Sequence, residues 1–396
     1  MVLNAQTISS NIDEAPRTIT ILGSTGSVGV STVDLLMRNS NNYLVDTLTA
    51  NQNVTLLAEQ AEQLNAKNVV IADETKYLEL KDYLSGKGIN IAAGTDSLIE
   101  AVDRPTDIVM AAIVGAAGLE PTLRAVQNGT VIALANKECL VSAGNLFCSE
   151  VARYGAQLIP VDSEHSAIFQ VLDVNSADKI SRIIVTASGG PFRNTSIAEM
   201  KNASPAEAIA HPNWDMGEKI SIDSATMMNK GLELIEAFHL FPVSEKQIEV
   251  VVHPESIVHS LVEYVDGSVL AQLGSPDMRT PIAYALAWPK RMEAPSERLN
   301  LWKVGTLNFE LPDENRFPAL RLAREALKTG GSAPTILNAA NEIAVDAFLN
   351  NRIGFLDIAM IVEKTLSSIE TETLLSIEDV IQADTIGRRI ANNMVP

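Results

Sequence analysis

Short apolar runs alternate with helical patterns along the first 160 residues, and this alternation limits the possible folds more than any other feature of the chain. Strands that alternate with helices are joined by crossover connections, which produce a parallel, doubly wound sheet. We therefore expect an α/β domain over residues 18–161, behind a disordered tail at residues 1–17. The predicted strands are Thr18–Leu22, Leu44–Thr49, Asn68–Ile71, Ile89–Ala92, Asp107–Ala112, Thr130–Ala133 and Gln157–Pro160, with helices such as Val28–Arg38 and Leu119–Asn128 between them.

The pattern changes after residue 161, where a second region begins. Asp266-Gly267 separates two alternating apolar runs, which is a strong hairpin signal. We expect an α+β domain at residues 162–287 with a partly antiparallel sheet, and the prolines between Pro276 and Pro318 indicate a connecting segment with a linker at 288–323. Residues 324–396 predict a helical domain. The strands are expected at Arg182–Ala187, Glu249–Val252, Val258–Tyr264 and Val269–Leu273, and the helices at Pro334–Leu349, Phe355–Ile369 and from Ser376 onward.

A glycine-rich turn follows the first predicted strand. Gly23, Gly26 and Gly29 lie between that strand and a helix, where residues without a Cβ permit a tight turn and a close approach to a pyrophosphate. The helix that begins after Gly26 would point its N–H groups at the phosphates. This placement favours a Rossmann-like dinucleotide site over the alternative, a tight loop that binds nothing.

The second predicted strand indicates which dinucleotide binds. NAD sites carry an acid at its end for the ribose hydroxyls. Here the strand ends in Thr49-Ala50-Asn51-Gln52-Asn53, which contains no acid and favours NADP, although a cation for the 2′-phosphate is missing too.

Two polar clusters suggest a metal and a phosphate site. Asp162 and Glu164 flank Ser163 after a predicted strand, and in an extended chain both carboxylates would lie on one face. The alternative is a solvated acidic loop. Further along, polar residues begin a helix, where they would hold a phosphate and a carboxylate would add a third oxygen ligand for Mg²⁺ or Mn²⁺. They are Ser224, Asn229, Lys230 and Glu233, and the alternative is a helix with a wet polar face.

Two further segments carry candidate substrate contacts. Ser188-Gly189-Gly190 follows a strand and offers donors to an anion. His211 and Trp214 lie in a long polar segment, typical of a lid, and the alternative is a Trp214 that packs in the fold. Lys137, after another strand, would face the pocket or pair with Glu138 at the surface.

Composition narrows the classes of partner. The formal net charge of −19 disfavours nucleic acid and anionic membranes, although it also serves solubility. Two cysteines without a CxxC pair make a disulfide scaffold or a cysteine zinc site unexpected. No apolar run is long enough to span a bilayer, and the N-terminus lacks a signal-peptide pattern. We expect a cytoplasmic enzyme.

Seven motifs together resemble one family. GSTGSVG, ANKE, VDSEHSA, ASGGPF, HPNWDMG, SATMMNKGLE and HPESIVHS occur in the order and spacing of the 1-deoxy-D-xylulose-5-phosphate reductoisomerases, from about Ile19 to the C-terminus. The resemblance implies an NADPH domain, a central catalytic domain with a flap at about 198–218, a linker, a C-terminal helical domain and a homodimer. It implies conversion of 1-deoxy-D-xylulose 5-phosphate to 2-C-methyl-D-erythritol 4-phosphate in the non-mevalonate isoprenoid pathway, with NADPH and Mg²⁺ or Mn²⁺, and Co²⁺ as a further candidate.

The resemblance also implies roles for individual residues. The metal ligands would be Asp162, Glu164 and Glu233. The substrate would contact Ser163, Glu164, Ser188, His211, Ser224, Asn229, Lys230 and Glu233, with Lys137, Glu164, His211 and Trp214 catalytic and His259 near the pocket. NADPH would contact Thr25, Gly26, Ser27, Val28, Asn51, Gln52, Asn53, Asn136, Lys137, Glu138 and Gly217. The departure is Gln52, where the family commonly has Lys or Arg.

Two other functions remain as alternatives from the sequence. A semialdehyde dehydrogenase has a similar glycine loop but needs a nucleophilic cysteine in its second domain, whereas Cys139 and Cys148 both lie in the first region. A non-enzymatic NADP-sensing regulator would show neither turnover nor metal dependence, and would have no use for three carboxylates.

Overall fold

The computed structural model describes residues 15–214 and 216–396, so most of the tail expected at residues 1–17 lies outside the described residues. Within them the chain forms two compact units. One contains residues up to 139 together with 147–166 and 278–296, and the other contains 140–146, 167–277 and 297–396. Arg17, expected in the tail, instead begins the first strand and donates from Nη1 to the Leu286 carbonyl at 2.8 Å.

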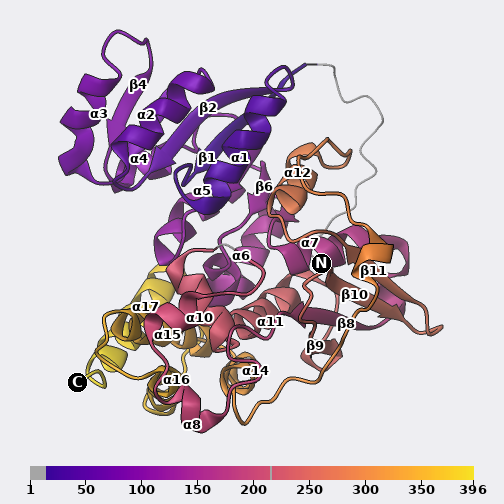
Figure 1. Ribbon diagram of the computed structural model, residues 1–396. Coiled ribbons are helices and arrows are strands. Elements are labelled where there is room, and N and C mark those ends of the chain that lie inside the picture. Colours follow the sequence, from indigo (N-terminus) through magenta and orange to yellow (C-terminus); the bar gives the residue numbers. More distant parts are fainter. Residues whose placement is uncertain (1–14, 215) are drawn as a thin grey trace. The chain divides into compact units, whose positions relative to one another are not determined.

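The first unit is built on a seven-stranded parallel sheet in the order β4-β3-β2-β1-β5-β6-β7 (Figure 1). The central strand β1 buries Ile19, Ile21 and Leu22 completely, as expected for a strand covered on both faces. The α/β class predicted from the alternation is confirmed. The strands are β1 (Arg17–Leu22), β2 (Tyr43–Ala50), β3 (Asn68–Ile71), β4 (Asn90–Ala93), β5 (Ile108–Ala111), β6 (Val131–Leu134) and β7 (Gln157–Pro160).

Helices connect these strands, as the crossover rule requires. Helix α1 begins immediately after the glycine turn and α5 begins at Leu119, both as predicted. The helices are α1 (Ser27–Arg38), α2 (Val54–Gln63), α3 (Tyr77–Tyr83), α4 (Thr95–Glu100), α5 (Leu119–Gln127), α6 (Glu138–Tyr154) and α7 (Ser163–Val171).

The second unit contains a four-stranded sheet in the order β11-β10-β8-β9. β10 is antiparallel to both β8 and β11, while β8 and β9 are parallel, so the partly antiparallel sheet is confirmed. Gly267 has φ +84° in the turn between β10 and β11, a conformation that glycine adopts readily. The strands are β8 (Ile180–Ala187), β9 (Ile248–Val252), β10 (Val258–Tyr264) and β11 (Val269–Leu273).

Helices make up the rest of the second unit. The last helix starts at Ser376 as predicted, with a capping box in which Ser376 and Asp379 exchange side-chain and backbone hydrogen bonds. The helices are α8 (Ile197–Met200), α9 (Pro205–Ile209), α10 (Glu218–Ala225), α11 (Met228–Leu240), α13 (Leu301–Val304), α14 (Ala319–Thr329), α15 (Ala333–Leu349), α16 (Phe355–Ser367) and α17 (Ile377–Asn392).

The proline-rich segment between Pro276 and Pro318 is more structured than a simple connection. Helix α12 (Arg279–Ala287) packs against α1, β6 and β7, so residues 278–296 group with the first unit. This grouping differs from the prediction, which placed residues 278–287 in the catalytic domain and residues 288–323 in a linker. The prolines obscured α12 because Pro281 occupies its first turn, where proline is tolerated. None of the helices in the described ranges is long and apolar enough to cross a membrane.

Candidate active site

The three positions in the first turn are occupied by glycine for different physical reasons. Gly23 has φ +86°, and a Cβ there would lie 2.8 Å from the Ala112 carbonyl oxygen. A Cβ at Gly29 would lie 2.2 Å from the Gly23 carbonyl oxygen, so this glycine lets α1 pack on the turn. Gly26 is exposed, and a Cβ there would meet only an ordinary contact at 3.6 Å. Packing within the protein therefore explains Gly23 and Gly29, whereas Gly26 leaves open space at the start of α1.

Helix α1 has the properties of an anion site at its N-terminus. Gly26 is its N-cap and provides no side-chain cap, and the first turn contains no acidic residue. The N–H groups of this turn and the helix dipole therefore favour a phosphate. Thr25 and Ser27, which the sequence assigned to the cofactor, lie in this turn with Val28.

The loop after β2 contains a finding that the sequence did not reveal. Gln52 donates from Nε2 to Asp73 Oδ2 at 3.1 Å, because β2 and β3 are parallel neighbours and Ala50 pairs with Ile71. The segment Thr49–Asn53 contains no acid, as the sequence shows, but Asp73, which follows the neighbouring strand β3, lies beside it. Hydrogen bonds from Thr75 and Gln52 lower the pKa of Asp73. Asn51, Gln52 and Asn53 are exposed, and Asn53 Oδ1 caps α2 by accepting from Leu56 N.

The segment after β6 forms the start of α6. Asn136 donates to the carbonyls of Ile113 and Gly115 and accepts from Cys139 N at 2.9 Å. Lys137 Nζ lies 3.4 Å from Asp162 Oδ2. Because Lys137 and Glu138 are both buried, the alternative of a surface pair between them is excluded.

Asp162 and Glu164 are held by a helix start and not by extended chain. Asp162 Oδ1 accepts from the backbone N–H of Glu164 at 3.1 Å and of His165 at 3.4 Å, which is the bonding of a helix N-cap. Ser163 donates from Oγ to Glu164 Oε2 at 2.6 Å. The predicted extended geometry is wrong, since Ser163 already belongs to α7. The cap instead fixes the Asp162 carboxylate.

The polar face of α11 is buried. Glu233 accepts hydrogen bonds from Asn229 Nδ2 and Lys230 Nζ, at i+4 and i+3 along the helix. Lys230 is 5% exposed and Glu233 is 0% exposed, so the alternative of a wet polar face is excluded. The apolar residues Met227, Met228, Leu232 and Ile235 are buried as well.

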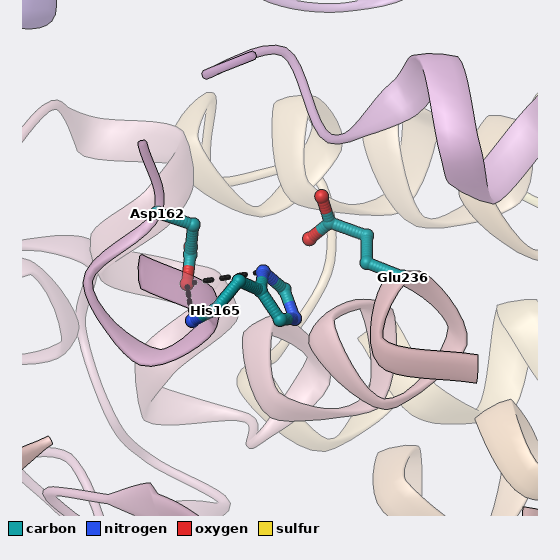
Figure 2. Close-up of side chains that lie close together, drawn as sticks. All are labelled: Asp162, His165 and Glu236. Carbon is teal, nitrogen blue, oxygen red and sulfur yellow. Dashed lines mark hydrogen bonds and ion pairs between the residues drawn. The ribbon is translucent and has the colours of Figure 1, made fainter. Parts of the chain in front are cut away.

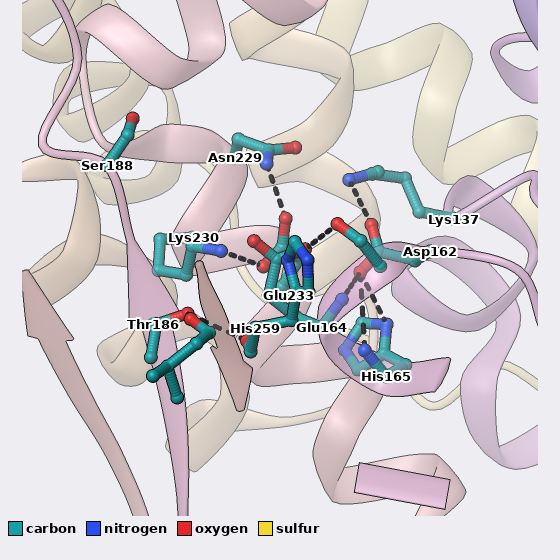
Figure 3. Close-up of polar contacts among 12 residues, drawn as sticks. Lys137, Asp162, Glu164, His165, Thr186, Ser188, Asn229, Lys230, Glu233 and His259 are labelled. Carbon is teal, nitrogen blue, oxygen red and sulfur yellow. Dashed lines mark hydrogen bonds and ion pairs between the residues drawn. The ribbon is translucent and has the colours of Figure 1, made fainter. Parts of the chain in front are cut away.

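Three carboxylates form a group that suits a divalent cation. One oxygen from each of Asp162, Glu164 and Glu233 lies within 4.8 Å of the others. Figure 3 shows the three side chains together. Carboxylate oxygens are the preferred ligands of Mg²⁺ and Mn²⁺. Like charges this close repel one another, and a cation would relieve that repulsion. The residues present therefore fit a hard divalent ion.

A second group, which the sequence did not reveal, shares Asp162. It adds His165 and Glu236, whose ligand atoms also lie within 4.8 Å of one another (Figure 2). Both added side chains are buried. His165 Nδ1 lies 3.3 Å from Asp162 Oδ1, so this histidine supports the orientation of the carboxylate. The available signal was spacing, since His165 follows Asp162 by three residues and Glu236 follows Glu233 by three.

The loops after β8 and α9 bring Ser188 and His211 together. Ser188 Oγ and His211 Nε2 are 2.8 Å apart. A Cβ at Gly190, which has φ +65°, would lie 2.8 Å from the Ser224 carbonyl oxygen, so the glycine lets this loop lie against the end of α10. Gly217, the predicted cofactor contact, is the N-cap of α10.

Trp214 is only partly exposed and lies near another predicted pocket residue. Its ring centroid is 6.1 Å from that of His259, with the ring planes tilted by 59°. Trp214 therefore lies on a loop with its ring next to that of His259.

The glycine turn and the carboxylate group define a class, the NADP-dependent oxidoreductases, and solved relatives agree. A 1-deoxy-D-xylulose 5-phosphate reductoisomerase from Zymomonas mobilis in complex with NADPH is similar with a TM-score of 0.92 and 55% identity, covering 97% of this chain and 99% of that one. A DOX-P reductoisomerase in complex with NADPH, fosmidomycin and magnesium has a TM-score of 0.91 and 45% identity over 96% of this chain and 98% of that one.

Sequence comparison gives the particular family. Residues 19–144 match 1-deoxy-D-xylulose 5-phosphate reductoisomerase, 158–241 match its C-terminal domain, and 273–390 match the DXP reductoisomerase C-terminal domain. The 1-deoxy-D-xylulose 5-phosphate reductoisomerase of Rhodospirillum centenum is 58% identical over 395 residues, covering 100% of this chain and 98% of the relative. The chain belongs to the 1-deoxy-D-xylulose 5-phosphate reductoisomerase family.

Proposed function

We propose that this chain isomerises 1-deoxy-D-xylulose 5-phosphate and reduces the product to 2-C-methyl-D-erythritol 4-phosphate, with NADPH and Mg²⁺ or Mn²⁺, for non-mevalonate isoprenoid synthesis. The observation that carries the proposal is the group of three carboxylates next to the buried Lys230 and the half-buried Asn229 on α11. Such a set binds a metal and an anionic substrate together.

The metal site is assigned to Asp162, Glu164 and Glu233. A divalent ion bound there supplies positive charge that stabilises the negative charge developing on substrate oxygens during the rearrangement. Lys230 is a compact cation beside this site, and Lys137 is a second one on the Asp162 side. Ser163 donates to Glu164, and its hydroxyl is assigned to the reacting end of the substrate.

The phosphate site is assigned to Ser188, His211, Ser224, Asn229 and Lys230. Ser188 and His211 are already hydrogen-bonded, and the loop of Ser188 lies against Ser224. Lys230 and Asn229 carry donors that can turn from Glu233 to an anion once a metal neutralises that carboxylate. Trp214 would cover the site and exclude water from the aldehyde before hydride transfer.

NADPH is assigned to the N-terminus of α1, with contacts from residues on several loops. The pyrophosphate would lie at Gly26, where the open space and the uncapped N–H groups are found. The assigned contacts are Thr25, Gly26, Ser27, Val28, Asn51, Gln52, Asn53, Asn136, Lys137, Glu138 and Gly217.

Product analysis tests this function. The purified chain is incubated with 1-deoxy-D-xylulose 5-phosphate, NADPH and Mg²⁺, and the product is identified by NMR. We expect one 2-C-methyl-D-erythritol 4-phosphate for each NADPH oxidised. Oxidation of NADPH without this product would contradict the proposal.

The semialdehyde dehydrogenase alternative lacks an activated nucleophile. Burial raises the pKa of the Cys148 thiol to about 12, whereas a catalytic cysteine needs a lowered pKa. Cys139 is completely buried. Both cysteines are free, which agrees with the reducing cytoplasm that we propose as the compartment.

We also propose a homodimer that forms through the edge of the second sheet. Strand β11 is an edge strand of that sheet, and Val269 and Leu270 on it are 46% and 45% exposed. Unpaired edges with apolar side chains are typical pairing surfaces. A charge at Leu270, as in Leu270→Glu, should shift the chain to a monomer in sedimentation, while Leu78→Glu on exposed α3 should not. Unchanged sedimentation of Leu270→Glu would place the interface elsewhere.

A further inference from the structure

The loop at residues 253–256 is tightly anchored. His253 is completely buried, and its Nδ1 lies 2.8 Å from the Asn308 carbonyl oxygen. Its ring stacks on Phe309 at 4.7 Å with 15° between the planes. Glu255 accepts from both the backbone and the side chain of Asn308. This loop therefore offers fixed positions to any group that bonds to it.

Asn213, on the loop that carries His211 and Trp214, bonds to this anchor. Its amide Nδ2 donates to the Pro254 carbonyl at 2.6 Å and to Ser256 Oγ at 3.0 Å. An amide nitrogen carries two hydrogens, so both are used here. Ser256 is itself held in place, since it is 8% exposed and adopts φ +52°.

The backbone N–H groups of Asn213 and Trp214 determine which nitrogen of the His211 ring carries the hydrogen. His211 Nδ1 receives the N–H groups of Asn213 at 3.2 Å and Trp214 at 3.0 Å. Backbone N–H groups only donate, so Nδ1 must carry a lone pair, and the neutral ring has its hydrogen on Nε2. That hydrogen then points to Ser188 Oγ at 2.8 Å.

The consequence reaches the hydroxyl of Ser188. Its oxygen accepts from His211 Nε2 and from Gly190 N at 3.2 Å, which uses both lone pairs. The hydroxyl hydrogen is therefore left to donate to a third group. A phosphate oxygen of the substrate is such an acceptor. With the hydrogen of His211 on Nε2, the Ser188 hydroxyl is therefore oriented to donate a hydrogen bond to the phosphate.

We propose that Asn213 is a positioning residue, which fixes the loop to Pro254 and Ser256 so that His211 presents its Nε2 hydrogen to Ser188. The proposal rests on the assignment of Ser188 and His211 to the substrate phosphate. Asn213 touches neither substrate nor cofactor in this account and acts through His211.

Steady-state kinetics of matched variants test the proposal. Asn213→Ala removes both side-chain donors, and Asn213→Asp places carboxylate oxygens against the Pro254 carbonyl. We expect the KM for 1-deoxy-D-xylulose 5-phosphate to rise about tenfold in Asn213→Ala, and more in Asn213→Asp, as expected for the loss of two hydrogen bonds. The KM for NADPH should stay the same. Asn202, exposed in the same segment, provides the controls Asn202→Ala and Asn202→Asp, which should leave both constants unchanged.

Ser256→Ala removes one acceptor and completes a double-mutant cycle with Asn213→Ala. Because the two groups share a hydrogen bond, the effects on substrate KM should be less than additive. An unchanged substrate KM in Asn213→Asp, additive effects in the cycle, or equal effects in the Asn202 controls would overturn the proposal. A purely structural role would lower kcat and the melting temperature but leave the KM unchanged. Absence of turnover in the unmutated chain would instead contradict the proposed function.

Discussion

Lys137 Nζ and Asp162 Oδ2 lie 3.4 Å apart, and their side chains are only 11% and 15% exposed. The lysine follows β6 and the aspartate caps α7, so two separate strand ends supply the pair (Figure 3). A buried carboxylate without a cation is costly, and here a lysine provides partial compensation. The lysine ammonium thus lies beside one of the three carboxylates of the candidate metal site.

Replacement of one metal ligand should separate metal binding from cofactor binding. Glu233→Gln removes a negative charge while it keeps the size of the side chain. We expect metal affinity and kcat to fall roughly 100-fold, the upper range for altered metal environments. NADPH affinity should not change. Glu325→Gln, on the exposed face of α14, is the matched control for the charge removed. Normal metal affinity in Glu233→Gln would show that α11 does not supply a ligand.

The loop at residues 210–217 should become protected when the site fills. The Trp214 ring lies near that of His259, and Asn213 bonds to Pro254, so both residues already have contacts on the facing strand and loop. We expect limited proteolysis between about Asn202 and Gly217 to slow several-fold with NADPH, Mg²⁺ and fosmidomycin, because a closed loop fits a protease poorly. Cleavage at the same rate with the inhibitor demonstrably bound would mean that Trp214 is simply packed in the fold.

Much of the fold follows from local patterns in the sequence. Strands β3, β7, β10 and β11 begin and end at the predicted residues, since turn residues bound each apolar run. The start of the last helix at Ser376 was also predicted, because its capping signal spans only the four residues from Ser376 to Asp379. Contacts between segments far apart in the sequence could not be predicted from such local patterns. The packing of α12 on the first unit depends on a fold that brings residues 279–287 to α1, and no local pattern encodes it.

The site shows the same division between local and long-range information. The types of the metal and phosphate residues were predicted, but the way they converge was not. Asp162 is fixed by a helix cap and not by extended chain, because Ser163 already has helical bonding. The contact between Asp73 and Gln52 could not be predicted, because only the pairing of β2 with β3 brings these two residues together. His165 and Glu236 were missed because no local pattern shows that residues more than 70 positions apart form one group.

The Gln52–Asp73 hydrogen bond changes what a cation would do for NADPH. Gln52→Arg should tighten NADPH binding by about 1–2 kcal/mol through a charged hydrogen bond to the 2′-phosphate. Asp73 would compete for the guanidinium, so the double variant Gln52→Arg, Asp73→Asn should bind NADPH more tightly than Gln52→Arg alone. NADH affinity should hardly change in either variant. Dissociation constants for both cofactors test this, and equal shifts for NADH and NADPH would place the 2′-phosphate elsewhere.

His239 should make the folded state sensitive to acid. Burial lowers its pKa from 6.5 to about 4, so the folded chain keeps this ring neutral while the unfolded chain binds a proton as the pH falls. The stability that comes from keeping this ring neutral is fully present above about pH 6.5 and is lost as the pH falls toward 4. The free energy of unfolding should decrease by roughly 2 kcal/mol by pH 5. Urea unfolding at several pH values measures it. The free energy of unfolding of His239→Gln should fall less between pH 7 and 5 than that of the unmutated chain, and equal slopes would contradict this account.

Turnover should depend on a divalent ion that Asp162, Glu164 and Glu233 hold. The most direct measurement is NADPH oxidation with 1-deoxy-D-xylulose 5-phosphate after complete removal of metal by a chelator, followed by titration with Mg²⁺ or Mn²⁺. We predict no oxidation without metal, full recovery on its return, and a much higher metal requirement in Glu233→Gln. Full activity in excess chelator would contradict the claim.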